Sequence, residues 1–279
     1  MKYHVTNIYD EYGIAKPENA IGKLTCWIQT PNKNNYPTRK MPAILVLPGG
    51  GYAMTSSREA EPIAMEFYAR GYSAFVLDYT CAPAKFPTAL REAVLAMDYI
   101  RKHAGEWDIN PQMVAAIGFS AGGHLCGTLG MMYDCPEVSD LVTGDQARPD
   151  ALGLCYPVAV SWGKTHDNSF INLAGDDQAL RDRLSLDRLV RPDMPPVYIW
   201  HTRTDATVPV RNSLVLSVAL DEAEVPFAMH IYGTGRHGLS LPDARTHPAN
   251  ELPEVSLDMK YWVDECAGFF AERGFAITD

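Results

Sequence analysis

Ser120 stands in a Gly-Phe-Ser-Ala-Gly sequence at residues 118–122, directly after the apolar residues 114–117. A serine with glycine two positions before and after it can occupy a tight turn between a strand and a helix, which exposes the hydroxyl group. A side chain at Gly118 or Gly122 would collide with the neighbouring strand or helix in such a turn. The spacing therefore makes Ser120 the candidate nucleophile of an acyl-transfer reaction.

A glycine-rich segment lies upstream of this serine. The apolar residues 43–47 are followed by Pro48 and three consecutive glycines, which is typical of a buried strand that opens into a loop. The backbone N–H groups of Gly50, Gly51 and Ala121 are candidate donors to the negative charge that develops on an attacked carbonyl oxygen. The alternative for the glycines is a simple turn after a strand.

Asp205 is the candidate acid. It lies in a polar loop just after the predicted strand at residues 197–202, where a carboxylate can reach a histidine across the edge of a sheet. Three competing carboxylates lie in polar stretches with no preceding strand, so a solvated or helix-capping role is expected for Asp176, Asp177 and Asp193.

His237 is the candidate base among eight histidines. It lies in a glycine-flanked loop after the predicted strand at residues 227–232, and it completes the chain order Ser, Asp, His. His201 and His230 fall inside predicted strands and are expected to be hydrogen-bonded residues of the sheet. His124 follows the serine by one helical turn and is expected to pack or to bond locally.

Several motifs accompany these residues. They are Leu-Pro-Gly-Gly-Gly-Tyr at 47–52, Asp-Tyr at 78–79, the Ala-Pro and Phe-Pro pairs at 82–83 and 86–87, Asp-Ala-Thr-Val-Pro at 205–209, and His-Gly-Leu-Ser at 237–240. Over roughly residues 20–273, the chain resembles the α/β-hydrolases of the esterase and lipase superfamily. More narrowly, it resembles the small, mostly bacterial acetyl esterases that are grouped with acetyl xylan esterases. Pro48 stands where the similar His-Gly-Gly-Gly loop of lipases and esterases has histidine.

The resemblance implies a serine carboxylesterase with an α/β-hydrolase fold and no cofactor or metal. In such an enzyme His237 would take the proton of Ser120, Asp205 would orient the imidazole, and water would hydrolyse the acyl-enzyme. The expected substrate is a short acyl ester, above all an acetyl ester, of a carbohydrate or related polar alcohol, such as an acetylated oligosaccharide. Glycoside cleavage is not expected, because nothing in the sequence resembles the paired carboxylates of a glycosidase.

Two alternatives to an esterase stay open at this point. The serine, acid and histidine motifs also resemble the catalytic domains of oligopeptidases, although the chain has no room for the propeller domain that filters their peptides. The second alternative is a binding protein that keeps the fold without catalysis. The intact nucleophile, acid, base and glycine loop argue against it.

The elements that must position these residues alternate along the chain. Strand signals lie near residues 24–29, 43–48, 73–79, 114–119, 151–156, 197–202 and 227–232. Apolar residues recur on one helical face between Leu90 and Ile100 and again between Met259 and Phe270. This alternation predicts an α/β fold with a mainly parallel central sheet that is covered by helices on both faces.

Residues 157–195 are expected to form a small cap that leaves the cleft open, which suits a short acyl group on a bulky polar alcohol. Trp162 and His166 from this insertion, and Tyr52 beside the glycine loop, are candidates to stack on the alcohol or to bond to it. The alternatives are loop packing for Tyr52, a core position for Trp162 and a surface capping role for His166.

The overall composition fits one compact enzyme. The chain has 279 residues, of which 47% are hydrophobic, and no linker or repeat divides it, so a single domain over residues 1–279 is expected. A net charge of −10 argues against nucleic acids and anionic membrane surfaces as partners. The N-terminal residues lack the apolar core of a secretory signal, and a cytoplasmic location is expected. No pattern determines the oligomeric state.

Overall fold

The fold is organised around one sheet. The computed structural model describes residues 1–142 and 144–279, and within them eight strands pair in the order β1-β2-β4-β3-β5-β6-β7-β8. The strands are β1 (Lys2–Asn7), β2 (Lys23–Ile28), β3 (Met41–Leu47), β4 (Ser73–Asp78), β5 (Ile109–Phe119), β6 (Leu152–Cys155), β7 (Val197–Thr202) and β8 (Phe227–Tyr232). Strands β3 to β8 pair in parallel, whereas β1 and β2 run antiparallel to their neighbours. The predicted mainly parallel sheet is confirmed.

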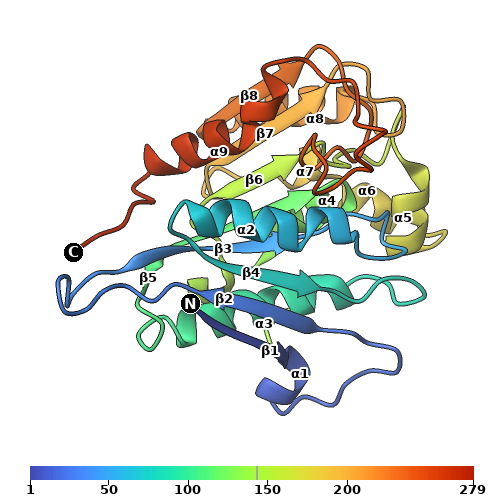
Figure 1. Ribbon diagram of the computed structural model, residues 1–279. Coiled ribbons are helices and arrows are strands. Elements are labelled where there is room, and N and C mark those ends of the chain that lie inside the picture. The colour runs from blue at the N-terminus through green and yellow to red at the C-terminus, as the bar shows by residue number, and fades with distance from the viewer. Residues whose placement is uncertain (143) are drawn as a thin grey trace.

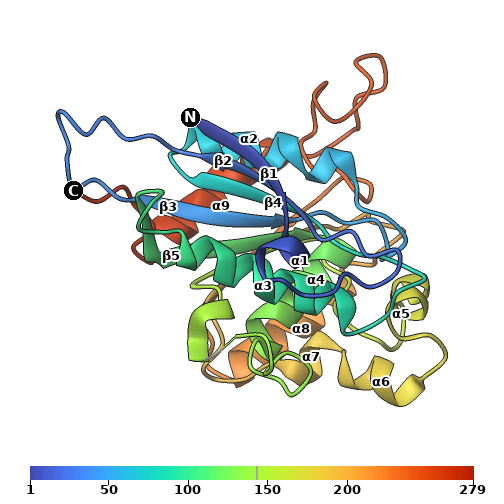
Figure 2. The ribbon, with the colours of Figure 1, turned by 90° about the horizontal axis from the view of Figure 1, so that it is seen from below.

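Helices cover both faces of this sheet (Figures 1 and 2). The longer ones are α2 (Glu61–Ala69), α3 (Thr88–Lys102), α4 (Ala121–Met132), α5 (Asp167–Ala174), α8 (Arg211–Glu222) and α9 (Trp262–Ala271). The shorter ones are α1 (Ile8–Glu11), α6 (Gln178–Arg183), α7 (Leu186–Leu189), η1 (Ser57–Glu59), η2 (Gly144–Ala147) and η3 (Met259–Tyr261). Helices α2 and α9 lie on one face, and α3, α4 and α8 lie on the other.

Two apolar layers separate the sheet from its helices. On one face, Phe67 of α2 and Trp262 of α9 are fully buried in the same cluster as Val46 of β3. On the other, Val94 of α3 and Leu125 of α4 join a cluster with alternate residues of the same strands. Because both faces are covered, every residue of β3 is buried, which explains why this strand is a continuous apolar run in the sequence.

The N-terminal residues, which none of the motifs explained, extend the sheet. Strand β1 pairs with β2 at the edge, where half of its residues are exposed and none is buried. Helix α1 follows, and the buried hydroxyl of Tyr9 in this helix donates a hydrogen bond to Glu92 of α3 at 2.7 Å. The segment therefore closes one end of the core.

Residues 157–195 contain α5, α6 and α7 and lie at the side where the parallel strands end (Figure 1). The side-chain amide of Asn172 in α5 donates to the carbonyl of Gly51 at 2.8 Å, which attaches the insertion to the glycine loop. In the described ranges, 1–142 and 144–279, no helix is both long and apolar enough to cross a membrane.

Candidate active site

Ser120 occupies the sharp turn between β5 and α4. Its backbone has φ 54° and ψ −117°, in the left-handed half of the conformational map that a side chain rarely adopts. Its N–H donates to the carbonyl of Cys155 at 3.0 Å, and its carbonyl accepts from the N–H of Val158 at 3.0 Å. These bonds to the end of β6 hold the strained turn in place.

The glycines that flank this turn are required by close backbone contact. A Cβ atom at Gly118 would overlap the carbonyl group of Gly122, and one at Gly122 would overlap the carbonyls of Leu47 and Pro48. Both contacts would be shorter than those that real Cβ atoms make with backbone atoms. The predicted steric role of the two glycines is confirmed.

The structure brings Ser120, Asp205 and His237 into one chain of hydrogen bonds. Nδ1 of His237 lies 2.6 Å from Oδ2 of Asp205, and Nε2 of His237 lies 2.8 Å from Oγ of Ser120. Because an ionised carboxylate only accepts, Nδ1 holds the proton and the electron pair of Nε2 faces the serine hydroxyl. An imidazole in this tautomer can take the hydroxyl proton when the serine attacks a carbonyl group.

Asp205 is held in its ionised form. Its side chain is fully buried, and Oδ1 accepts hydrogen bonds from the N–H groups of Thr207 and Val208, each at 2.9 Å. Burial alone would raise the pKa of the Asp205 carboxyl group, but interactions with His201 and His237 outweigh it and hold that pKa below its usual range. The acid therefore stays negative and can stabilise a protonated imidazole.

The loops that present the acid and the base are bonded to each other. The carbonyl of Gly235 accepts hydrogen bonds from the hydroxyls of Thr202 and Thr204, each at 2.9 Å. The N–H of Gly235 donates back to the Thr204 hydroxyl at 2.9 Å. Further along, Nε2 of His247 donates to the carbonyl of Leu239 at 2.8 Å. The loop with His237 is thus anchored on both sides.

Of the two histidines in predicted strands, His201 has the hydrogen-bonded role that its position predicts. Nε2 of His201 donates to the carbonyl of Val208 at 2.8 Å, and its Nδ1 accepts from the hydroxyl of Ser213 at 2.8 Å. His230 lies in β8 with Nδ1 3.3 Å from Glu265. His201 also supports the acid, because its Nε2 is 3.4 Å from Oδ2 of Asp205.

His124 is a buried packing residue, as its place on the helix predicts. Its Nε2 donates to the carbonyl of Leu184 at 2.7 Å, so its Nδ1 accepts from the hydroxyl of Tyr52 at 2.9 Å. Burial lowers the pKa of His124 to about 4, although the bond to Leu184 opposes this. The imidazole is therefore neutral near neutral pH, and its two ring nitrogens bond to Tyr52 and Leu184.

The glycine loop after β3 faces the same cavity as Ser120. The carbonyl of Gly50 accepts from the N–H groups of Ala53 at 3.0 Å and Met54 at 3.3 Å, in a tight turn with φ 129° at Gly50. A Cβ atom there would overlap the carbonyl of Met54, so glycine is required. In the described part of the chain, the N–H groups of Gly50 and Gly51 have no hydrogen-bond acceptor. Ala121 is the first residue of α4, so no carbonyl of the helix can accept a hydrogen bond from its N–H.

A buried carboxyl group outside the sequence motifs connects the glycine loop to the histidine loop. Oε2 of Glu59 accepts from the N–H of Gly49 at 2.8 Å, and Oε1 accepts from the hydroxyl of Tyr156 at 2.6 Å. The Tyr156 oxygen accepts in turn from the N–H of Ser240 at 3.0 Å. The Tyr156 ring also lies edge-on to the His237 ring, with centroids 5.1 Å apart. Glu59 thereby positions two loops of the site.

This carboxyl group should make stability depend on pH. Burial raises the pKa of Glu59, and the bonds from Tyr156 and Gly49 only partly offset it. An acid with a raised pKa in the folded chain contributes most stability below its ordinary pKa, and that contribution is lost as the pH rises through the raised value. We expect the melting temperature of Glu59→Gln to rise relative to that of the wild type as the pH increases from about 4 to about 8, because the amide stays neutral over this range.

Thermal melts of both proteins across this pH range test the expectation. Glu61→Gln is the matched control, because Glu61 is the exposed carboxylate two residues further along the chain. A difference in melting temperature between Glu59→Gln and the wild type that does not vary with pH would contradict it.

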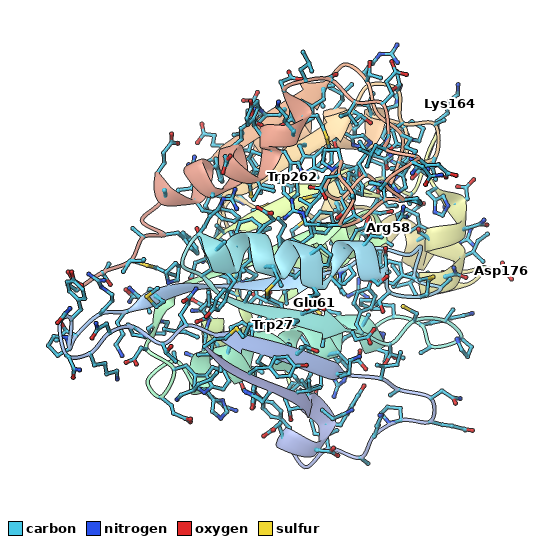
Figure 3. All side chains as sticks on the ribbon, viewed as in Figure 1. Trp27, Arg58, Glu61, Lys164, Asp176 and Trp262 are labelled. Atoms are coloured by element: carbon cyan, nitrogen blue, oxygen red, sulfur yellow. The ribbon has the colours of Figure 1, made fainter. Side chains whose placement is uncertain are left out.

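The cavity beside Ser120 has a volume of about 420 Å³, within the range of small-molecule sites. Its polar lining comprises Ser56, Arg58, Glu59, Ser120, His166, Asn168, Asn172, Thr207 and His237, and its other lining residues are Gly50, Gly51, Ala53, Met54 and Gly238. Figure 3 shows Arg58 on the side of the molecule where Asp176 of the insertion also lies.

The three residues suggested as substrate contacts lie in different surroundings. His166 lines the cavity, with Nδ1 2.8 Å from the hydroxyl of Ser169. Tyr52 is 3% exposed and bonds to His124 below the glycine loop, so substrate contact is not supported for it. Trp162 lies outside the cavity lining, where its Nε1 donates to Asp187 at 3.0 Å, so packing accounts for it as well.

The competing carboxylates have the predicted surface roles. Asp177 is the N-cap of α6, where its side chain accepts from the N–H of Leu180 at 2.9 Å. Asp193 pairs with Arg191 at 2.6 Å, and Asp176 is exposed. Across the residues that the structure describes, no group of three or more His, Cys, Asp or Glu side chains could hold a metal ion.

The chain is similar to solved structures along almost its whole length. The acetyl ester-xyloside bifunctional hydrolase of Caldicellulosiruptor lactoaceticus is 32% identical with a TM-score of 0.81, and the match covers 98% of this chain and 97% of that one. The carboxylesterase Cest-2923 of Lactobacillus plantarum is 25% identical with a TM-score of 0.84 over 100% of both chains.

Sequence relatives show a shorter match. The BD-FAE family matches residues 28–151. Endo-1,4-beta-xylanase B of Butyrivibrio fibrisolvens is 38% identical over 72% of this chain and 33% of that protein. Acetylxylan esterase of Xylanibacter ruminicola is 30% identical over 70% of this chain and 40% of that protein. These matches span about a third to two fifths of the length of the curated relatives.

Proposed function

Because this chain belongs to the esterases of the α/β-hydrolase family, we propose that it is a serine carboxylesterase that removes short acyl groups from a carbohydrate or related polar alcohol. Acetyl is the proposed acyl group, and an acetylated oligosaccharide is the proposed substrate. The proposal rests above all on the polar lining of the cavity in which the Ser120 hydroxyl meets His237.

The lining favours a small acyl group. Apart from glycine, the apolar lining residues are Ala53 and Met54, whereas the remaining side chains are polar or charged. A methylene group of a longer acyl chain that has no apolar contact loses about 0.8 kcal/mol of favourable binding free energy. The apolar side chains below the glycine loop, including Tyr52 and Leu173, leave a void of only about 10 Å³. A fatty acyl chain has no place there, whereas a polyhydroxylated alcohol can bond to the polar lining.

In the proposed mechanism, Nε2 of His237 takes the proton of Ser120 as the hydroxyl oxygen attacks the ester carbonyl. Asp205 keeps the proton on Nδ1 and stabilises the imidazolium. The N–H groups of Gly50, Gly51 and Ala121 donate to the oxyanion. The protonated His237 then gives its proton to the leaving alcohol, and water repeats the sequence on the acyl-enzyme.

We further propose that residues 1–279 act as one domain in which residues 157–195 form a small cap. His166, Asn168 and Asn172 of this segment line the cavity, and Asn172 is bonded to the glycine loop. A cap of this size leaves one side of the cavity open, which suits an alcohol larger than the acyl group.

The acyl preference is tested with p-nitrophenyl esters from acetate to octanoate. We expect kcat/KM to fall at least about tenfold from acetate to octanoate, because each added methylene meets polar groups. Acetylated xylo-oligosaccharides then test the alcohol, and peptide p-nitroanilides serve as the amide comparison. A preference for octanoate would contradict the short-acyl proposal, and faster cleavage of the anilides would favour a peptidase.

A further inference from the structure

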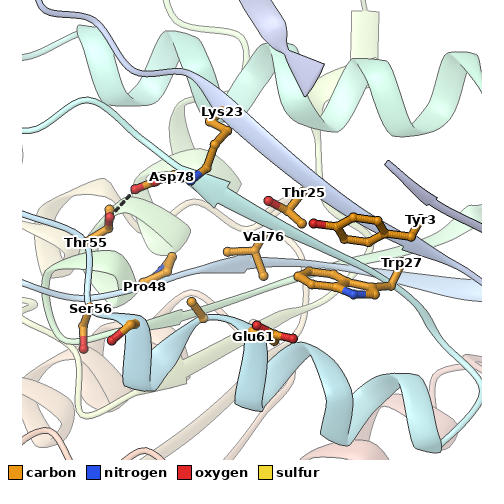
Figure 4. Close-up of a pocket in the computed structure, with 12 residues that line it drawn as sticks. Tyr3, Lys23, Thr25, Trp27, Pro48, Thr55, Ser56, Glu61, Val76 and Asp78 are labelled. Carbon is orange, nitrogen blue, oxygen red and sulfur yellow. Dashed lines mark hydrogen bonds and ion pairs between the residues drawn. The ribbon is translucent and has the colours of Figure 1, made fainter. Parts of the chain in front are cut away.

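A second cavity adjoins the one that contains Ser120. It has a volume of about 370 Å³ and lies along β2 and the last residues of β4, beside the start of α2 (Figure 4). Its lining comprises Tyr3, Lys23, Thr25, Trp27, Pro48, Thr55, Ser56, Ser57, Ala60, Glu61, Val76 and Asp78. We call this cavity the β2 groove. None of the proposed catalytic residues lies in it.

The two cavities share one wall. Ser56 lines both of them, and Met54 and Arg58 on the catalytic side alternate with Thr55 and Ser57 on the other. Pro48, which directly precedes the glycine loop, lines the β2 groove as well. A ligand that extends past this segment from the Ser120 cavity would therefore reach the β2 groove.

The groove combines an aromatic surface with hydroxyl groups. The ring of Tyr3 is tilted against that of Trp27, with centroids 5.7 Å apart, and Tyr3 is 58% exposed. Figure 4 shows the two rings at one end of the groove. The hydroxyls of Thr25, Ser56 and Ser57 form no hydrogen bond to another described residue. The rings and Thr25 lie at one end of the groove and Ser56 lies at the other (Figure 4). Apolar ring surface and free hydroxyls along one groove suit a chain of sugars, which have C–H faces and hydroxyl groups.

The charges of the groove favour a neutral ligand. The ammonium group of Lys23 is paired with Asp78 at 2.9 Å, and Asp78 also accepts a hydrogen bond from Thr55. Glu61 adds a carboxylate at the α2 side that forms no ion pair with any residue the structure describes. The lining therefore has one more negative than positive group, and an anionic ligand would be repelled.

We propose that the β2 groove is a subsite for the neutral sugar units that flank the acetylated residue of an oligosaccharide substrate. This inference rests on the proposed function, because it assigns a place to the alcohol part of the ester. Tyr3 supplies the stacking surface and the hydroxyls bond to the sugar. The groove thus favours longer chains over a single acetylated sugar.

The experiment compares p-nitrophenyl acetate with acetylated xylotriose on the full chain. Tyr3→Ala removes the exposed ring, and Ser57→Trp fills the groove from its exposed rim. We expect each variant to lose about tenfold in kcat/KM on acetylated xylotriose, mainly through KM, and to change by less than about twofold on p-nitrophenyl acetate. Tyr261→Ala is the control, since Tyr261 is 52% exposed and lines neither cavity.

The possible results separate this inference from the proposed function. If the wild type and both variants hydrolyse acetylated xylotriose equally well, the groove assignment is wrong and the esterase proposal stands. If the wild type hydrolyses p-nitrophenyl acetate but no acetylated sugar, the carbohydrate proposal fails and the subsite fails with it. A direct readout is titration of Ser120→Ala with xylotriose, which should bind more weakly when Tyr3→Ala is added.

Discussion

Replacing Ser120 with alanine is expected to lower kcat for p-nitrophenyl acetate by about 10⁶-fold. The hydroxyl that faces Nε2 of His237 at 2.8 Å is removed, so no acyl-enzyme can form. The folded chain should persist, because alanine fits wherever serine does at this position and the backbone bonds of the turn remain. Initial rates of wild type and variant, prepared in parallel, measure the effect.

A fluorophosphonate probe gives an independent readout of the same residue. The wild type should form one covalent adduct, which mass spectrometry of digested protein should locate at Ser120, and the alanine variant should form none. Ser139→Ala is the matched control, since Ser139 is an exposed serine whose hydroxyl donates to the carbonyl of Pro136. Turnover by the purified Ser120→Ala variant within tenfold of the wild type would rule out this nucleophile.

The second large effect is expected for Asp205→Asn, which should lower kcat by about 10⁴-fold. An asparagine amide oriented to keep the bonds from Thr207 and Val208 places its NH2 group toward Nδ1 of His237. Nδ1 must then accept, the proton moves to Nε2, and the imidazole can no longer take the proton of Ser120. The variant should therefore have nearly normal geometry and very low activity.

Asp177→Asn is the control for this substitution, because asparagine is as good an N-cap as aspartate and the residue lies outside the cavity. The assay is run well below the melting temperature of each protein, since loss of the low pKa of Asp205 also removes stability at neutral pH. Activity of Asp205→Asn close to that of the wild type would show that another group orients the base.

The residues of the candidate site could be predicted because each follows a strand in a recognisable local pattern. Parallel strands end at the same edge of a sheet, so loops after β5, β7 and β8 must converge, even though Ser120 and His237 are 117 positions apart. The two glycines could be predicted from the Gly-x-Ser-x-Gly pattern, although a Cβ atom at Gly118 would meet the nearby carbonyl of Gly122 and one at Gly122 would meet the distant carbonyls of Leu47 and Pro48. Short-range rules were therefore enough for these side chains.

The parts that could not be predicted depend on tertiary packing. Glu59 contacts Tyr156, 97 positions away, and neither residue lies in a motif that would single it out. The N-terminal strand β1 lies at the edge of the sheet, where half of its residues are exposed and none is buried, so its apolar pattern is weak. For Tyr52 and Trp162, residue type suggested a stacking role, but only the fold determines which way each ring points.

Strand β6 has a consequence for the precision of the site. The N–H of Ser120 bonds to Cys155 at the end of β6, and the N–H of Tyr156 bonds to Trp200 of β7. The pairing of the adjacent strands β5, β6, β7 and β8 is therefore one route by which the serine is aligned with the acid and base loops. A slip of one residue between any two of them would displace the hydroxyl by about 3.3 Å, more than a hydrogen bond tolerates. The register of these strands therefore determines the distance between the Ser120 hydroxyl and the His237 imidazole.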